Sequence, residues 1–142
     1  MTENAIVSPP PQLDWARIAA DLDSQGHAIT GPLLSPDACQ DLKTLYPRPE
    51  LFRSRVVMAH HGFGRGEYQY FANPLPDPLP AMRRRLYAGL APIANDWGVR
   101  LGREQPFPAR LDDLTTLCRH AGQTRPTSLM LQYGPGDYNR LH

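Results

Sequence analysis

The sequence lacks any segment that would span a membrane or direct export. No apolar run approaches the roughly 18 consecutive residues that a transmembrane helix requires. The N-terminus also lacks a basic segment followed by an apolar run, which is the pattern of a secretory signal. These absences predict a cytoplasmic protein without a membrane partner.

Cysteine is scarce and the charges are balanced. The two cysteines, Cys39 and Cys118, belong to no Cys-x-x-Cys pair. They fit a reducing compartment, and we expect both to be small buried apolar side chains. The 15 basic and 14 acidic side chains give a net charge of +1. Because there is no excess of positive charge, the sequence predicts no nucleic-acid partner.

Common catalytic motifs are absent as well. No Gly-x-Ser-x-Gly occurs, so the turn that carries a hydrolase nucleophile is not indicated. The loop Gly62–Gly66 has glycines but no Gly-Lys-Ser/Thr, and it connects two expected strands, so it is not a phosphate loop. His60 and His61 are adjacent, so on extended backbone they point apart and cannot easily share one metal ion. The run Arg83–Arg85 is interpreted as the solvated face of a helix.

What is present is a chain of domain size with many prolines. A length of 142 residues predicts one domain with its own core. Proline accounts for 16 residues, about twice the usual ~5%, which favours short elements and defined loops. Residues 1–12 contain Ser8-Pro-Pro-Pro11 and are expected to form a flexible tail, while residues 13–142 form the domain.

Four segments have the apolar spacing of amphipathic helices. Gly26 follows the first segment in the position that a C-cap prefers. Ser35-Pro-Asp37 combines an N-cap hydroxyl with proline at the first helical position of the second. Pro92 is expected to kink the third helix or to break it near Gly89. The expected helices are Leu13–Gln25, Ser35 to the residue before Pro47, Ala81–Trp97, and Leu111–Ala121, the last with Leu111, Leu114, Leu117 and Cys118 buried.

Four other segments predict strands, which makes the fold α+β. Phe52–Ala59 and Glu67–Phe71 flank a glycine-rich loop and are expected to form a hairpin. His27–Thr30 and Leu129–Tyr133 are expected to lie together in one sheet. After Tyr133 a Gly-Pro-Gly turn and a second short extended segment, Asp137–His142, lead to the last residue.

This last stretch resembles a known family. Tyr133-Gly-Pro-Gly-Asp-Tyr138, followed by His142, is similar to the strand that precedes a His-x-Asp metal motif in 2-oxoglutarate/Fe(II)-dependent oxygenases of the bacterial prolyl-hydroxylase-like group. The resemblance extends through Arg53–Phe71 and Ala121–Thr127. It implies a double-stranded β-helix (jelly-roll or cupin-like), of which this chain supplies the outer helices and the first strands, so that the barrel is incomplete.

The resemblance also implies roles for particular residues. His142 is the first iron ligand, and a His-x-Asp spacing would put both ligands on one face of a strand. Tyr133 projects toward 2-oxoglutarate, and Tyr138 and Asn139 are weaker candidates for the pocket wall. The family's aspartate, distal histidine and basic 2-oxoglutarate anchor would follow His142. We therefore expect residues 1–142 alone to be inactive and to bind neither Fe(II) nor 2-oxoglutarate well.

Two further expectations concern partners. The family's hydroxylation reaction implies a small-molecule or peptidyl substrate, and an open barrel edge implies self-association. A different class of function is left open, in which the chain is a non-catalytic α+β binding or interaction module derived from the oxygenase fold.

Overall fold

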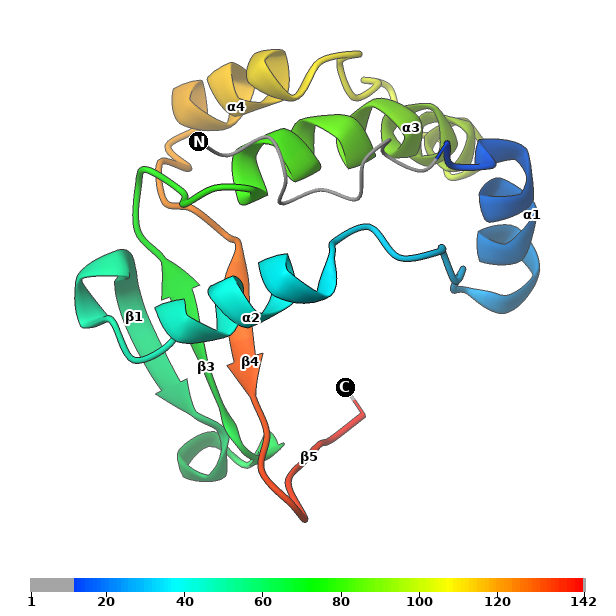
Figure 1. The fold of residues 1–142 in the computed structure, drawn as a ribbon. Coiled ribbons are helices and arrows are strands. Elements are labelled where there is room, and N and C mark those ends of the chain that lie inside the picture. Colours follow the sequence, from blue (N-terminus) through cyan, green and yellow to red (C-terminus); the bar gives the residue numbers. More distant parts are fainter. Residues whose placement is uncertain (1–11, 142) are drawn as a thin grey trace. The chain divides into compact units, whose positions relative to one another are not determined.

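The computed structural model describes residues 12–141, so the predicted tail lies almost entirely outside the described part. Within that part the chain has helices and short antiparallel strands, and no helix there is long and apolar enough to cross a bilayer. The elements are α1 (Trp15–Gln25), α2 (Pro36–Leu45), β1 (Phe52–Val57), β2 (Gly64–Arg65), β3 (Glu67–Phe71), α3 (Leu79–Arg100), α4 (Leu111–His120), β4 (Leu129–Gln132) and β5 (Tyr138–Asn139), with 3₁₀ turns at Pro49–Leu51 and Met58–His61 (Figure 1).

The chain divides into two compact units. The first, here called the helical unit, contains residues 1–39 and 77–123 and holds α1, α3 and α4. The second, the sheet unit, contains residues 40–76 and 124–142 and holds the described strands β1 to β5. Helix α2 spans the boundary in sequence. The sheet unit is therefore built from two segments of chain, with most of the helical unit inserted between them.

Local signals in the sequence fix the ends of the first two helices. The side chain of Asp14 accepts a hydrogen bond from the backbone N–H of Arg17 at 3.0 Å and caps α1. Gly26 ends α1 with φ of 76°, and its N–H donates to Leu22 O, as the sequence predicts. Ser35 Oγ accepts from the N–H of Ala38 at 3.2 Å and caps α2 in the same way.

Helix α3 continues through Pro92 as one helix and does not break near Gly89. The glycine has another role. A Cβ at position 89 would lie 1.9 Å from Cε2 of Trp15, so the indole of α1 packs directly against the backbone of α3. Of the two predicted alternatives, a kink at Pro92 or a break near Gly89, the break was wrong; Gly89 instead serves a close helix–helix contact.

The loop between α3 and α4 is held by side chains of α3. Tyr87 donates to Pro108 O at 2.7 Å, and Asn95 donates to Phe107 O and accepts from Phe107 N at 3.0 and 2.7 Å. Helix α4 then lies alongside α3 (Figure 1). No described residue of α4 is fully buried, and Leu117 is 56% exposed. The prediction that the apolar stripe of α4 is buried was wrong for Leu117.

The main sheet is antiparallel, with strand order β1-β3-β4 (Figure 1). The pairing of β1 with β3 confirms the predicted hairpin around the glycine-rich loop. Strand β4 pairs with β3, with Leu129 opposite Tyr70 and Leu131 opposite Tyr68. The short strands β2 and β5 form a second ladder.

The segment His27–Thr30 is not a strand, and it does not pair with β4. The carbonyl of Ile29 instead accepts a hydrogen bond from the guanidinium of Arg17 at 3.0 Å, and the Ile29 side chain is 77% exposed. A side-chain donor therefore satisfies this one carbonyl, and the segment pairs with no described strand. Cys39 is exposed and Cys118 half-buried, so the prediction of two buried cysteines was wrong for Cys39.

Candidate functional site

Strands β3 and β4 present one aromatic and apolar face. Side chains two apart on a strand point the same way, and the register aligns Tyr68 with Leu131 and Tyr70 with Leu129. The two tyrosine rings contact each other edge to face, with centroids 5.6 Å apart. This face is therefore a fixed aromatic wall flanked by leucines.

A cavity of about 410 Å³ lies over this wall, entirely within the sheet unit. Its size falls within the range of small-molecule sites, and its mixture of apolar and a few polar groups is typical of them. We call it the tyrosine cavity. It is lined by Met58, Phe63, Tyr68, Tyr70, Leu129, Leu131 and Asn139.

The short ladder between β2 and β5 positions Asn139 in this lining. Gly64 pairs with Asn139, and Arg140 N donates to Phe63 O at 2.9 Å. Gly64 has φ of 126°, and a Cβ there would lie 2.2 Å from Tyr138 O, so only glycine allows the two backbones to approach. Asn139 adds an amide to an otherwise aromatic and apolar cavity.

Arg53 lies beside the tyrosine cavity because β1 is irregular at that point. Phe52 pairs with Phe71, but Ser54 pairs with Tyr70, so two residues of β1 oppose one step of β3. This two-to-one count defines a β-bulge, which redirects a side chain. The guanidinium carbon of Arg53 lies 4.4 Å from the centroid of the Tyr70 ring, and its Nε donates to Pro126 O at 3.0 Å.

Tyr133 and Tyr138 lie differently from Asn139. Tyr133 follows β4 and is 44% exposed, and its ring rests on Gly66, where a Cβ would come within 2.8 Å of Cδ1. It lines another cavity, of about 420 Å³, with Gly66, Glu67, Gln132, Gly134 and Asp137. Tyr138 is half-exposed in β5 and pairs with Arg65. Tyr133 and Asn139 therefore line two separate cavities.

The predicted iron ligand, His142, lies outside the described residues. Within residues 12–141 no group of three His, Cys, Asp or Glu side chains is arranged to hold a metal ion. His60 and His61 are both exposed, and the ring of His61 stacks on Phe63 with centroids 5.4 Å apart. The described residues therefore do not by themselves fit an iron site.

The other face of the sheet carries a polar network. The hydroxyl of Tyr46 donates to Glu67 Oε1 at 3.1 Å, and Arg55 Nε donates to Glu67 Oε2 at 3.0 Å. The buried amide of Gln69 donates to Tyr46 O at 2.8 Å. Burial, with the Glu67 carboxylate next in importance, raises the pKa of Tyr46 to about 12. With these partners the network joins Tyr46 to β1 and β3.

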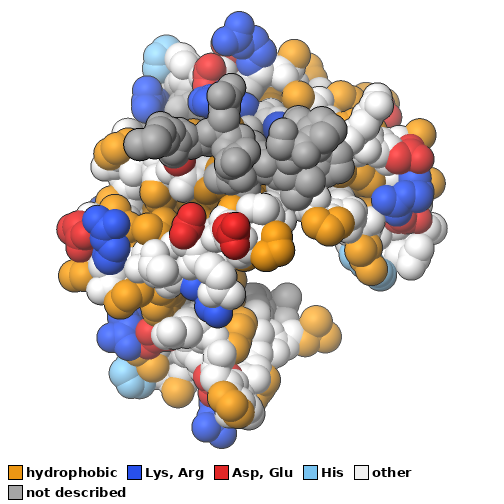
Figure 2. Space-filling view, in the orientation of Figure 1, with side chains coloured by type: hydrophobic (Ala, Val, Ile, Leu, Met, Phe, Trp, Pro, Cys, Tyr) orange, Lys and Arg blue, Asp and Glu red, His pale blue; other side chains and the backbone are white. Residues whose placement is uncertain are grey.

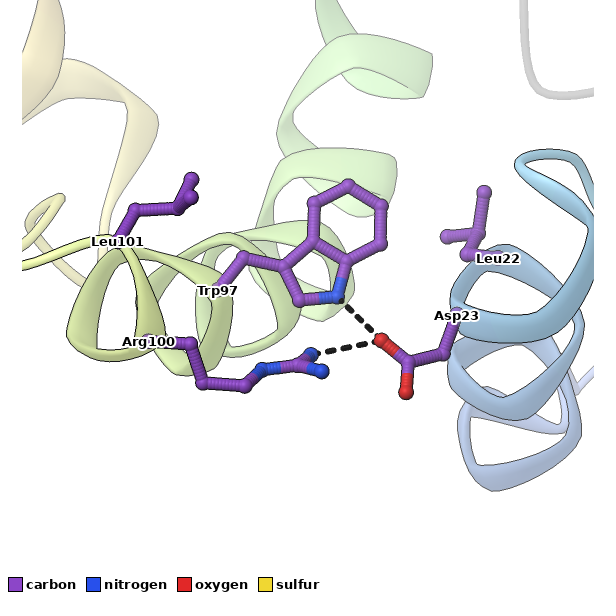
Figure 3. Close-up of a pocket in the computed structure, with 5 residues that line it drawn as sticks. All are labelled: Leu22, Asp23, Trp97, Arg100 and Leu101. Carbon is purple, nitrogen blue, oxygen red and sulfur yellow. Dashed lines mark hydrogen bonds and ion pairs between the residues drawn. The ribbon is translucent and has the colours of Figure 1, made fainter.

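A hollow of about 290 Å³ in the helical unit is lined by polar groups that join α1 to α3 (Figure 3). Asp23 Oδ1 in α1 accepts from Trp97 Nε1 at 3.1 Å and from Arg100 Nη2 at 2.7 Å, both in α3. The Arg100 hydrogen bond is the main reason that the pKa of Asp23 lies below its usual value. The polar groups of this hollow are thus already paired with one another, and they link α1 to α3.

Charge is divided unequally between the units. The helical unit carries ten acidic and eight basic side chains, whereas the sheet unit carries seven basic and four acidic ones. On the face shown in Figure 2, basic and acidic side chains are interspersed among apolar ones. The balanced charge of the whole chain therefore conceals a basic sheet unit and an acidic helical unit.

Sequence reasoning did not identify Tyr68, Tyr70 or Arg53 as site residues. The alternation of Tyr68 and Tyr70 predicted the strand, and two tyrosines at i and i+2 were a usable signal for an aromatic face. No such signal marked Arg53, because its position depends on a bulge that the sequence does not reveal. Of the predicted site residues, Asn139 lines the tyrosine cavity.

A family profile matches residues 66–142, which is more than half of the chain and includes β3, β4 and β5. The family is described as "Oxygenase, catalysing oxidative methylation of damaged DNA". The chain belongs to this oxygenase family. The resemblance to oxygenases in general is thereby confirmed.

Two curated relatives come from Mycobacterium tuberculosis: Uncharacterized protein MT2286 of strain CDC 1551 / Oshkosh and Uncharacterized protein Rv2227 of strain ATCC 25618 / H37Rv. Each is 49% identical over 72 residues, which is 51% of this chain and 31% of the relative. The chain thus spans about a third of the length of these relatives. No solved structure matches it significantly.

Proposed function

We propose that this oxygenase uses Fe(II) and 2-oxoglutarate, and that the sheet unit begins a double-stranded β-helix whose interior includes the tyrosine cavity. The supporting observation is the cavity itself. Four of its lining residues lie on β3 and β4, which are antiparallel neighbours inside the segment that matches the oxygenase family. A barrel of this kind holds its ligand against inward-facing side chains of adjacent strands.

In this proposal His142 supplies one iron ligand, and residues outside the described part supply the others. In such enzymes O2 is the oxidant; Fe(II) held by two histidines and a carboxylate would activate it, with 2-oxoglutarate as the co-substrate that is oxidised to succinate and CO2. A single imidazole gains no chelate effect, so residues 1–142 alone are expected to bind iron weakly. The described residues contribute the cavity wall, which orients the substrate and excludes water.

Damaged DNA is the substrate named in the family description, and two features of the sheet unit support a nucleic-acid substrate here. One is its excess of basic side chains, seven against four acidic ones. The other is the pair of tyrosine rings in the cavity, since nucleobases stack on aromatic side chains. The prediction of no nucleic-acid partner rested on the net charge of the whole chain, and it stays untested. That net charge averages over a basic sheet unit and an acidic helical unit.

The test is anaerobic Fe(II) titration followed by detection of succinate after oxygen and 2-oxoglutarate are added. It is made on residues 1–142 and on a longer polypeptide that supplies a carboxylate and a second histidine after His142, here called the complete polypeptide. We expect turnover only where His142 is joined by the remaining ligands. His142→Ala should abolish turnover, whereas His120→Ala, an exposed histidine at the end of α4, serves as the matched control and should not.

Each result has a definite meaning. Succinate formed by the His142→Ala variant would refute the ligand assignment. Turnover by residues 1–142 alone would refute the need for further ligands. Absence of both iron binding and succinate from the complete polypeptide would refute the 2-oxoglutarate mechanism and favour the non-catalytic binding module.

A further inference from the structure

We propose that Arg53 and Tyr70 bind the phosphodiester of a nucleic-acid strand at the edge of the tyrosine cavity. The inference rests on the proposed function, because it concerns the substrate of the same cavity. It adds a site for the backbone of that substrate, made by Arg53 on β1 and by Tyr70 on β3, which also lines the cavity.

The backbone geometry holds Arg53 at this edge. The bulge at Arg53 separates Phe52, which stacks on Phe71 with centroids 4.7 Å apart, from Ser54, which pairs with Tyr70. Arg53 is the extra residue between them, and its guanidinium rests on the ring of Tyr70. Bulges are over-represented at sheet edges, where β1 lies, and beside active sites, where they redirect a side chain.

The guanidinium of Arg53 keeps donors for a ligand. Its Nε is used by Pro126 O, which fixes the plane of the group over the tyrosine ring. Neighbouring arginines of the sheet unit differ, because Arg55 pairs with Glu67 and Arg65 lies 3.8 Å from Asp137. No described acidic side chain lies within ion-pair distance of Arg53. A planar, anchored guanidinium with free terminal N–H groups suits a phosphate.

Two anions have the chemistry that this site recognises: a phosphodiester and a carboxylate of 2-oxoglutarate. The surroundings favour the phosphodiester. Tyr68, Tyr70 and the apolar side chains around them offer a surface for a flat, partly apolar group such as a nucleobase. A small dicarboxylate gains little from that surface. The basic excess of the sheet unit also attracts a polyanion at a distance.

The experiment measures the binding of a short, fluorescently labelled single-stranded DNA to residues 1–142 by anisotropy at several salt concentrations, without iron or 2-oxoglutarate. We expect Arg53→Gln to weaken binding about three- to tenfold and to lower the slope of log K against log salt by about 0.7, the value for one phosphate contact on a single strand. Arg53→Lys keeps the charge but not the planar stack on Tyr70. Its salt slope should therefore equal that of the unaltered protein, and its affinity should fall less than that of Arg53→Gln.

Lys43→Gln is the matched control, because it removes one positive charge from an exposed position on α2. It should change neither the affinity nor the salt slope. Equal losses from Arg53→Gln and Lys43→Gln would overturn the proposal, since binding would then follow net charge alone. Circular dichroism establishes that both variants fold.

A measurement on the unaltered protein keeps the test independent of folding. Phenylglyoxal modifies accessible arginines, and mass spectrometry locates the modified residue. The oligonucleotide should protect Arg53. If 2-oxoglutarate protects Arg53 and the oligonucleotide does not, the site belongs to the carboxylate and the proposal is wrong.

The outcomes also separate this inference from the proposed function. Succinate formation by the complete polypeptide without Arg53-dependent DNA binding would refute the phosphodiester site and leave the oxygenase mechanism standing. Arg53-dependent DNA binding without succinate formation would refute the oxygenase mechanism and leave the phosphodiester site standing.

Discussion

The helical unit and the sheet unit differ in what holds their elements together. In the helical unit, side chains of α1 and α3 meet directly, as Trp15 does with Gly89 and Asp23 with Trp97 and Arg100. In the sheet unit, glycine at position 64 lets two backbones approach, and a polar network supports one face. The other face of the sheet lines a cavity.

This difference separates stabilisation from function. The polar groups that line the hollow of the helical unit bond to one another, so they have little capacity left for a ligand. The tyrosine cavity leaves aromatic rings, an amide and a neighbouring guanidinium available. Ligand binding is therefore expected in the sheet unit. Single substitutions in each unit test whether its stability depends on these contacts.

The largest effect is expected at Gly89. A Cβ there would meet the Trp15 ring at 1.9 Å, and the Gly89→Ala variant should lose about 2 kcal/mol despite the higher helix propensity of alanine. Gly98→Ala is the control in the same helix, since its nearest neighbour would be 3.5 Å away, and it should be neutral or stabilising by up to about 1 kcal/mol. Urea unfolding measures both, and equal values would show that α1 does not pack on α3 as described.

An effect of similar size but more local is expected at Gly64. Gly64→Ala combines a strained φ of 126° with a contact of 2.2 Å to Tyr138 O, so the ladder between β2 and β5 should open at a cost of about 2 kcal/mol. The reporter is hydrogen exchange at the Arg140 amide, which donates to Phe63 O. Gly62→Ala, with φ of 70° and open space around its Cβ, should cost about 1 kcal/mol from backbone strain alone and leave that amide protected.

The raised pKa of Tyr46 predicts that the sheet unit loses stability at alkaline pH. Its pKa is raised from 10.0 to about 12, so the contribution to stability is complete below pH 10 and is lost as the pH rises through 12. Tyr46→Phe should cost about 1 kcal/mol near neutral pH, through the lost hydrogen bond to Glu67, and should remove this part of the alkaline loss. Thermal melts across that pH range measure it, and an unchanged pH dependence in the variant would contradict the assignment.

The smallest effect is expected at Asp23, whose side chain is half-exposed. Its pKa is lowered from 3.8, chiefly by the hydrogen bond from Arg100, so its contribution is present above pH 3.8 and is lost as the pH falls through the folded-state value. Asp23→Asn and Arg100→Gln should each flatten this acid dependence slightly. The double variant should lose no more than either single variant, and additive losses would show that the pair is not coupled.

Much of the helical unit could be predicted because its signals are local. Gly26 and Ser35 act within one helical turn of the ends that they cap, so their spacing alone indicated those boundaries, whereas Asp14 was placed inside the first helix and instead caps it. The role of Gly89 could not be read in this way, since it depends on Trp15, which is distant in sequence. Apolar runs predicted β1 and β4, and alternation predicted β3, but His27–Thr30 has strand-like residues without a described partner strand.

The site was predictable only in part, for a related reason. The sequence pointed to the last strands and to Asn139, which lines the cavity. The resemblance implied that Tyr133 projects toward 2-oxoglutarate; its ring rests on Gly66 and lines a cavity separate from that of Asn139, which leaves that role untested. The bulge at Arg53 arises from pairing between strands, which no local pattern encodes.

The insertion of residues 77–123 into the sheet unit has a consequence for the order of folding. Strands β3 and β4 are hydrogen-bonded neighbours, yet residues 72–128 separate them along the chain. Closing so long a loop costs entropy before any pairing is gained, and topologies rich in distant contacts fold slowly. Helices α3 and α4 form from local contacts and shorten the effective loop, so they should appear before β4 docks. The wall of the tyrosine cavity is then completed late, and its assembly rate is limited by a helical hairpin that contributes no residue to it.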